Sequence, residues 1–223
     1  ADLGRVVAST SLSSYKSVID TSYIENSGDV RAVVRVNGHM IGDKESNMTL
    51  PFTLRFYLYY GSEQIRIQHS FVYDGNQNND FIKSLGLQFD VPFRETVYNR
   101  HVAFSFDKDS VWTEPVQPLD GRRELDREHD YLSDQMNGLR IPEYATFDEE
   151  QKKLLDDWAV WDGFRLSQLN DGSFTIRKRA TGKSPWIGTF TGTKSFGLAF
   201  VGDVSGGISA TLKDFWQSYP STL

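Results

Sequence analysis

The fold is decided by TLRFYLYYGSEQIRIQHSFVYD, residues 53–74. Apolar side chains occupy every second position on each side of its turn, GSE at residues 61–63. They are Leu54, Phe56, Leu58, Ile65, Ile67 and Phe71. Successive side chains of a β-strand point to opposite faces, so this period of two predicts a hairpin with one apolar and one polar face. His69 falls on the apolar face, where we expect a buried, satisfied histidine.

The same alternation extends outward along most of the chain. It recurs in VRAVVRV (30–36), GLQFDVPF (86–93), VYNRHVAFSF (97–106), GFRLSQL (163–169), SFTIRKR (173–179), WIGTFTG (186–192), FGLAFVGDV (196–204) and ISATLKDFWQS (208–218). The turn at residues 170–172, Asn-Asp-Gly, is a strong hairpin signal. About ten strands joined by short polar turns predict a mainly β fold, an antiparallel β-sandwich.

One segment breaks the pattern. Residues 120–160 are rich in charge and poor in β-branched side chains, and FDEEQKKLLDDW (147–158) is typical of a short helix with an acidic first turn. We therefore expect one domain over residues 1–223 with a short helical or irregular insertion around 120–160. The insertion either lies over or beside a binding face or is a solvated excursion without a role. Residues 1–20 are either a strand of a neighbouring domain or a loose end.

Composition excludes several classes of protein. The chain has 223 residues, no cysteine and a formal net charge of −6. It has no apolar run long enough to span a membrane. An acidic chain is unlike a general nucleic-acid binder, which presents a basic face. Any acidic ligand must be met by a local cluster of cations, because the long-range field repels it.

The strand around His101 offers a candidate catalytic group. With Val102, Phe104 and Phe106 pointing to the core, His101 stands on the other face, which we expect to be open. Histidine titrates near neutral pH and serves as a general base. Arg100 points to the opposite face unless a bulge intervenes. The alternative is a surface or structural histidine.

The hairpin of residues 163–179 is strongly basic. Arg177 and Arg179 share a face, and Arg165 precedes the turn. Guanidinium groups bind carboxylates through two parallel hydrogen bonds, which suits a uronic acid. Trp161 is the aromatic residue that we expect to be exposed for stacking on a sugar. The alternative is a solvated outer strand, since surface strands commonly carry Arg and Lys.

The loop YDGNQNND, residues 73–80, resembles part of a calcium loop. Its oxygen-bearing side chains alternate as Asp74, Asn76, Asn78 and Asp80, which is a spacing that hard cations use. The glycine and the closing glutamate of an EF-hand are absent. Asn, Asp and Gly are also the residues of an ordinary hairpin turn, so both a Ca²⁺ site and a plain turn remain open.

These segments together resemble a known family. LPFTLRFYLYYGSEQIRIQHSFVYDG (50–75) and the C-terminal pair FVGDVSGG and DFWQSYP (200–220) carry the most specific part of the likeness, which covers most of residues 18–223. They are similar to the exo-rhamnogalacturonan lyases of polysaccharide lyase family 26, the YetA-like proteins. The insertion is the least similar part.

The resemblance implies a fold, a reaction and partners. Family members have an N-terminal β-barrel-like domain, a central β-sandwich and a C-terminal helical toroid, and this chain looks like the central sandwich, inactive alone. The family cleaves the rhamnose–galacturonate bond of pectin by β-elimination, binds calcium, and acts in a secreted or periplasmic setting. The reaction needs a base for the C5 proton and a cation for the carboxylate. On chemistry, His101, Arg100 and Arg122 are the candidates.

Two further expectations follow from this likeness. The aromatic residues of FWQSYP (215–220) are expected to lie toward the missing helical domain, at a surface between domains. The alternative function is a carbohydrate-binding module that holds an acidic glycan without cleaving it, or an architectural sandwich that spaces two other domains.

Overall fold

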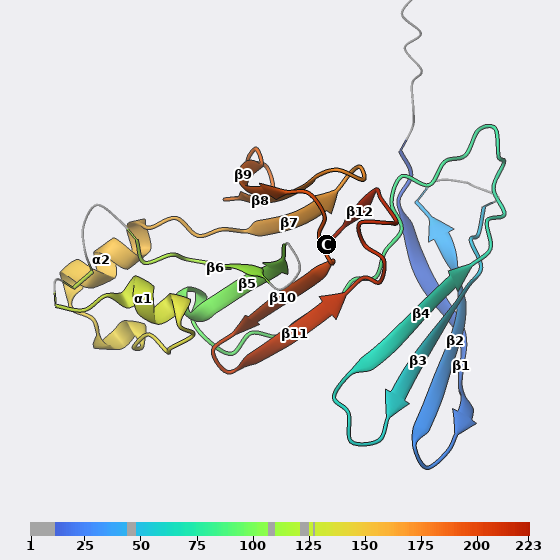
Figure 1. Ribbon diagram of the computed structural model, residues 1–223, viewed down its shortest axis with the longest axis horizontal. Coiled ribbons are helices and arrows are strands. Elements are labelled where there is room, and N and C mark those ends of the chain that lie inside the picture. Colours follow the sequence, from blue (N-terminus) through green and yellow to red (C-terminus); the bar gives the residue numbers. More distant parts are fainter. Residues whose placement is uncertain (1–11, 44–47, 107–109, 121–124, 127) are drawn as a thin grey trace, which may run out of the picture. The chain divides into compact units, whose positions relative to one another are not determined.

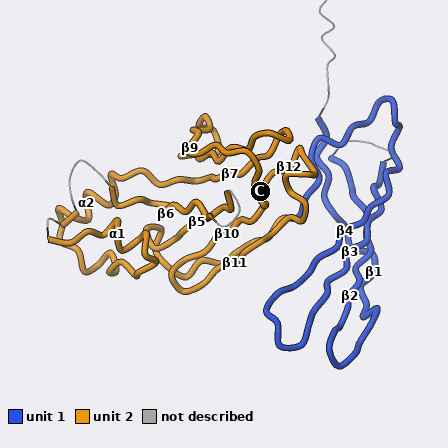
Figure 2. The backbone as a smooth tube through the Cα atoms, viewed as in Figure 1, with its two compact units in different colours: residues 1–87 blue, residues 88–223 orange. Residues whose placement is uncertain are grey.

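A computed structural model describes residues 12–223 except 44–47, 107–109, 121–124 and 127. Three four-stranded antiparallel sheets dominate these residues (Figure 1). The predicted mainly β class is confirmed. The chain divides into two compact units, Ala1–Leu87 and Gln88–Leu223 (Figure 2). The expectation of one domain over residues 1–223 stays a prediction, and each unit is described by itself. Within the described residues, no helix has the length and apolar character to cross a membrane.

The first unit contains one antiparallel meander, sheet A. Its strands, in spatial order, are β1 (Tyr15–Ser27), β2 (Arg31–Gly42), β3 (Phe52–Tyr59) and β4 (Ile65–Phe71). Val34 pairs with Phe56 and Phe56 with Ile67 on one face. The next row, Arg35–Arg55–Gln68, lies on the other face. This register confirms the hairpin and the two-faced pattern predicted from the sequence.

The second unit contains two sheets that share a core. Sheet B has the order β11 (Gly206–Thr211), β10 (Leu198–Asp203), β5 (Arg100–Ser105) and β6 (Val111–Pro115). Sheet C has the order β12 (Ser221–Thr222), β7 (Gly163–Gln168), β8 (Phe174–Arg179) and β9 (Ile187–Gly192). Phe104 of sheet B and Phe174 and Ile176 of sheet C belong to one buried apolar cluster. The predicted sandwich is therefore present in this unit, because apolar faces of two sheets are buried against each other.

The insertion folds into a small helical layer with its own core. Its helices are α1 (Tyr131–Met136), η2 (Tyr144–Thr146) and α2 (Glu149–Asp157), and η1 (Val97–Asn99) precedes β5. Asp148 caps α2 in a reciprocal capping box with Gln151, which satisfies backbone donors that the first turn leaves free. Leu155 of α2 is buried with Tyr98 and Ile141. The predicted helix is confirmed, and the insertion is not a solvated excursion.

The structure overturns two sequence-based expectations and bears on a third. Residues 86–93 form no strand, although they alternate in polarity. Residues 15–20 begin β1, which pairs with β2, and the assignment of residues 1–20 to a neighbouring domain stays a prediction. Phe215 of the FWQSYP segment does not face outward: it is 1% exposed and completes the core between sheets B and C.

Candidate functional site

The basic hairpin gathers three arginines on the outer face of sheet C. Arg165 on β7 lies directly opposite Arg177 on β8, and Gly163 lies opposite Arg179. The next pair along the strands, Leu166 and Ile176, points the other way and is fully buried. Because side chains alternate along a strand, all three guanidinium groups stand on the face opposite the core.

A tryptophan joins this face that sequence analysis did not single out. Trp186 lies between β8 and β9 in the sequence, and its ring is 4.3 Å from the Arg165 guanidinium carbon and 4.5 Å from that of Arg179. Arginine over an indole ring is a favourable cation–π contact. Gly163 leaves room for the contact between Arg179 and Trp186, since a Cβ at this position would come within 2.9 Å of Arg179 Nε and 3.5 Å of the Trp186 ring. We call Arg165, Arg177, Arg179 and Trp186 the Arg–Trp surface.

The charge on the Arg–Trp surface is not neutralised by the described residues. None of its three arginines forms an ion pair within that part of the chain. Arg179 donates from Nη1 to the Gly182 carbonyl oxygen at 3.0 Å, while its buried Nε has no hydrogen-bond partner among the described residues. A buried donor without an acceptor is costly to keep. The side chains of Arg165 and Arg177 are exposed, so their guanidinium groups can reach an external acceptor at this face.

Trp161 does not join the other predicted substrate-binding residues. Its ring lies 4.0 Å from the ammonium group of Lys178, and Lys178 forms a close ion pair with Glu114 on β6. Lys178 is adjacent to Arg177 on β8 and so points to the opposite face of sheet C. The structure therefore separates Trp161 from the Arg–Trp surface, and its role in binding stays a prediction.

His101 is half-buried beneath the insertion rather than on an open face. Its Nε2 lies 2.9 Å from the carbonyl oxygen of Gln135 in α1, so this nitrogen carries the proton and donates it. Burial lowers the pKa of His101. The open face expected beside His101 is thus wrong, because α1 covers it.

Arg100 lies apart from His101, as expected for neighbours on a regular strand. Its Nε donates to the Glu95 carbonyl oxygen at 3.0 Å, and its guanidinium carbon lies 4.8 Å from the Phe93 ring. Arg122 is outside the described residues. The catalytic roles of His101, Arg100 and Arg122 stay predictions.

The oxygen-rich loop after β4 is organised by its own hydrogen bonds. The Asp74 carboxylate accepts from the Thr49 hydroxyl at 2.6 Å and from the Leu50 N–H at 2.9 Å. These bonds lower the pKa of Asp74. The described residues hold no group of three or more His, Asp or Glu side chains placed for a metal.

Hydrogen bonds within the loop also hold residues 76–80. Asp80 accepts from the Asn76 N–H at 2.8 Å, and the Asn76 side chain accepts from the Asn78 N–H at 2.9 Å. The contacts therefore use several of the oxygens that a cation would need. Calcium binding here stays a prediction, which a fall in melting temperature on chelation would support.

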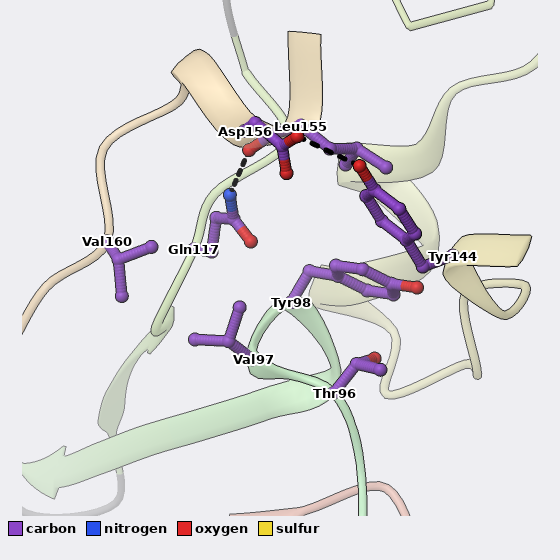
Figure 3. Close-up of a pocket in the computed structure, with 8 residues that line it drawn as sticks. All are labelled: Thr96, Val97, Tyr98, Gln117, Tyr144, Leu155, Asp156 and Val160. Carbon is purple, nitrogen blue, oxygen red and sulfur yellow. Dashed lines mark hydrogen bonds between the residues drawn. The ribbon is translucent and has the colours of Figure 1, made fainter. Parts of the chain in front are cut away.

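A pocket of about 380 Å³ lies between the insertion, η1 and the segment that follows β6 (Figure 3). Its lining includes Tyr98, Gln117, Tyr144 and Asp156. The Tyr144 hydroxyl donates to an Asp156 carboxylate oxygen at 2.9 Å, a bond that raises the pKa of Tyr144. A carboxylate in the wall disfavours an acidic ligand. The pocket therefore suits a uronic acid less well than the Arg–Trp surface.

Comparison with known proteins places the chain in a family. The profile of the PcRGLX-like protein central beta sandwich domain matches residues 5–223. The chain belongs to this family of PcRGLX-like central sandwich domains. It is also 32% identical over 210 residues to the "Uncharacterized protein YetA" of Bacillus subtilis (strain 168), covering 93% of this chain and 24% of that protein. The chain thus spans about a quarter of that relative's length. The resemblance inferred from the sequence is confirmed as rhamnogalacturonan lyase-like, and the domain is central in a larger protein.

A buried carboxylate in this PcRGLX-like domain connects the end of β10 to the segment that precedes η1. Asp203 at the end of β10 accepts from the backbone N–H of Arg94 at 2.8 Å and of Glu95 at 3.2 Å. It also accepts from the Ser205 hydroxyl at 2.6 Å and the Ser205 N–H at 2.8 Å. These bonds, led by the Ser205 hydroxyl, hold the pKa of Asp203 far below its ordinary value of 3.8.

We expect Asp203→Asn to lower the free energy of unfolding by about 2 kcal/mol near neutral pH, because the ionised acceptor is lost. The carboxylate's contribution is fully present above its ordinary pKa of 3.8 and is lost as the pH falls through its lowered folded pKa. The gap between wild type and variant should therefore shrink in acid. Urea unfolding at about pH 7 and about pH 3 measures it; a gap that grows in acid would contradict the assignment.

Proposed function

We propose that this chain is the central β-sandwich of an exo-acting rhamnogalacturonan lyase of polysaccharide lyase family 26. In this role it helps to bind the acidic polysaccharide that the whole protein cleaves by β-elimination. The observation that supports this most is the Arg–Trp surface. It presents three guanidinium groups, without carboxylate partners among the described residues, on a chain of net charge −6.

The chemistry of this surface matches a galacturonate unit. A carboxylate accepts two parallel hydrogen bonds from one guanidinium fork, which fixes the orientation of the sugar. Trp186 keeps Arg165 and Arg179 beside its ring, and an indole also packs against the apolar face of a sugar. Favourable contacts with the carboxylate position the polymer, while the base for the C5 proton is left to other parts of the protein. We therefore infer that the isolated chain binds without turnover.

The site is tested by binding of galacturonate-containing oligosaccharides to the whole 223-residue chain. Arg177→Ala/Arg179→Ala should weaken binding about a hundredfold or more, because each lost charge-assisted contact is worth about 1.5–3 kcal/mol. Isothermal titration calorimetry gives the affinity. Lys153→Ala/Lys213→Ala removes two exposed cations elsewhere and should leave affinity nearly unchanged. Equal affinity of both double variants would refute the Arg–Trp surface as the site.

The lyase assignment is tested separately on the full-length parent protein. Its incubation with rhamnogalacturonan should release unsaturated uronate, seen as a new ultraviolet absorbance, and this chain alone should release none. Binding by both proteins without product from either would favour the carbohydrate-binding module instead. Absence of binding and of product would leave an architectural sandwich.

A further inference from the structure

The polar face of sheet A carries a second concentration of arginine and tyrosine. Its rows pair Arg31 with Tyr59, and then Tyr57 with Arg66. The next row pairs Arg55 with Gln68. Figure 1 shows the four strands side by side in one sheet, so these side chains form a single face. The opposite face is the apolar one that the hairpin sequence predicted.

Tyr57 stands between two arginines on this face. The guanidinium carbon of Arg31 lies 5.9 Å from the Tyr57 ring centroid, and that of Arg66 lies 5.4 Å from it. The Tyr57 hydroxyl donates to Gln68 Oε1 at 3.0 Å, which fixes the ring. Arg31 and Arg66 are both exposed, and neither forms an ion pair among the described residues. Their hydrogen-bonding forks are therefore available to an external acceptor.

The neighbouring arginines are held by one glutamate. Arg55 donates to Glu25 at 2.7 and 3.1 Å, and Arg35 donates to it at 3.1 Å. The hydrogen bond from Arg55 is the first cause of the lowered pKa of Glu25. Two of the four arginines share this carboxylate, so the four arginines and Glu25 together carry three positive charges in excess. A local excess of positive charge attracts an anionic ligand, even on an acidic chain.

The polar face of sheet A has the same combination of arginines and an aromatic ring as the Arg–Trp surface of the second unit. In both places one aromatic ring lies beside two guanidinium groups that have no ion-pair partner among the described residues. We infer that the polar face of sheet A is a second binding surface for carboxylate-bearing polysaccharide, with Arg31 and Arg66 as the carboxylate-binding residues. This inference rests on the proposed function, and it adds a separate subsite in the first unit.

Two features favour a polysaccharide as the occupant. Tyr59 is 38% exposed and Tyr23 is 47% exposed, so rings for stacking flank the arginines. Arg31 and Arg66 stand on strands two apart, which are about 10 Å from each other, and they are offset by two residues along the strands. This separation suits separate carboxylates along an extended polymer. Tyr57 acts as a positioning residue, because its ring holds the side chains of Arg31 and Arg66 and does not itself bind the carboxylate.

The test uses the whole chain and galacturonate-containing oligosaccharides long enough to contact both Arg31 and Arg66. Calorimetry on wild type should show two classes of site. Arg31→Ala/Arg66→Ala should weaken one of them at least about tenfold and leave the other intact. Arg31→Lys/Arg66→Lys, which keeps the charge but loses the fork, should be weakened nearly as much. Tyr23 and Tyr59 are unchanged in both variants, and circular dichroism checks that sheet A is folded.

The outcomes separate this inference from the proposed function. One class of site, abolished by Arg177→Ala/Arg179→Ala and unaffected by Arg31→Ala/Arg66→Ala, would overturn the second surface and keep the first. Absence of any binding would overturn both. Equal binding of methyl-esterified oligosaccharide would show that carboxylates are not recognised here. Binding of a DNA oligonucleotide as tight as that of the acidic oligosaccharide would replace the inference with a general anion surface.

Discussion

Gln135→Ala should be one of the most destabilising single changes in the second unit. Gln135 is 1% exposed, and its Nε2 donates to the carbonyl oxygens of Tyr98 at 2.6 Å and Gln117 at 2.9 Å. Its Oε1 accepts from the Leu119 N–H at 2.8 Å. Truncation leaves three buried backbone groups without partners, which we expect to cost about 3–5 kcal/mol. The melting temperature should fall by about 10 °C.

Gln217→Ala is the matched control, since Gln217 is exposed. It should change the free energy of unfolding by less than about 0.5 kcal/mol. Thermal unfolding compares the two variants. Limited proteolysis adds a local measurement, because loss of Gln135 should make residues 128–157 the first segment cleaved. A Gln135→Ala variant as stable and as resistant as wild type would show that Gln135 does not fasten the insertion to the sandwich.

Gly197→Ala should destabilise the same unit by about 2–4 kcal/mol. Gly197 has a φ of +71°, which L-residues with a Cβ adopt at a cost of about 1 kcal/mol. An alanine Cβ would also stand 2.2 Å from the Cβ of Phe215, whose ring is in the core between sheets B and C. Forcing these atoms apart displaces a buried aromatic side chain, a further cost of about 1–3 kcal/mol.

Gly138→Ala separates the two causes. Gly138 has nearly the same φ, +69°, but a Cβ there would meet no atom within 4 Å. It should therefore show only the backbone cost, about 1 kcal/mol. Urea unfolding of the two variants gives the difference. Equal losses for Gly197→Ala and Gly138→Ala would mean that Phe215 yields without cost and that the core at Phe215 is loosely packed.

The alternation of side chains was enough to predict most of the strands. Residues 53–71 satisfy it on both strands of the hairpin, and Asn170-Asp171-Gly172 fixes the turn between β7 and β8. The pattern failed in two places. β1 is almost wholly exposed, so its backbone pairing with β2 leaves no mark in the side chains. Residues 86–93 alternate in polarity but pair with no strand in the described part of the chain.

The candidate site was predicted in part, for a related reason. Strand periodicity placed Arg177 and Arg179 on one face, because that depends on local geometry alone. The register of the hairpin adds Arg165, which lies opposite Arg177. It could not place Trp186, which returns to the sheet from the segment between β8 and β9. It also could not show that α1 covers His101, since that contact joins positions 34 residues apart through the fold of the insertion. Gly163, a glycine inside a strand beside arginine, was the one available sign of a close approach.

The facing arginines of β7 and β8 repel each other. Arg165 and Arg177 occupy opposed positions on neighbouring strands, and like charges so placed weaken a sheet. Dissolved salt relieves that repulsion and at the same time screens the attraction to a uronate. As ionic strength rises, we therefore expect the free energy of unfolding of the domain to increase and its affinity for the acidic polymer to fall.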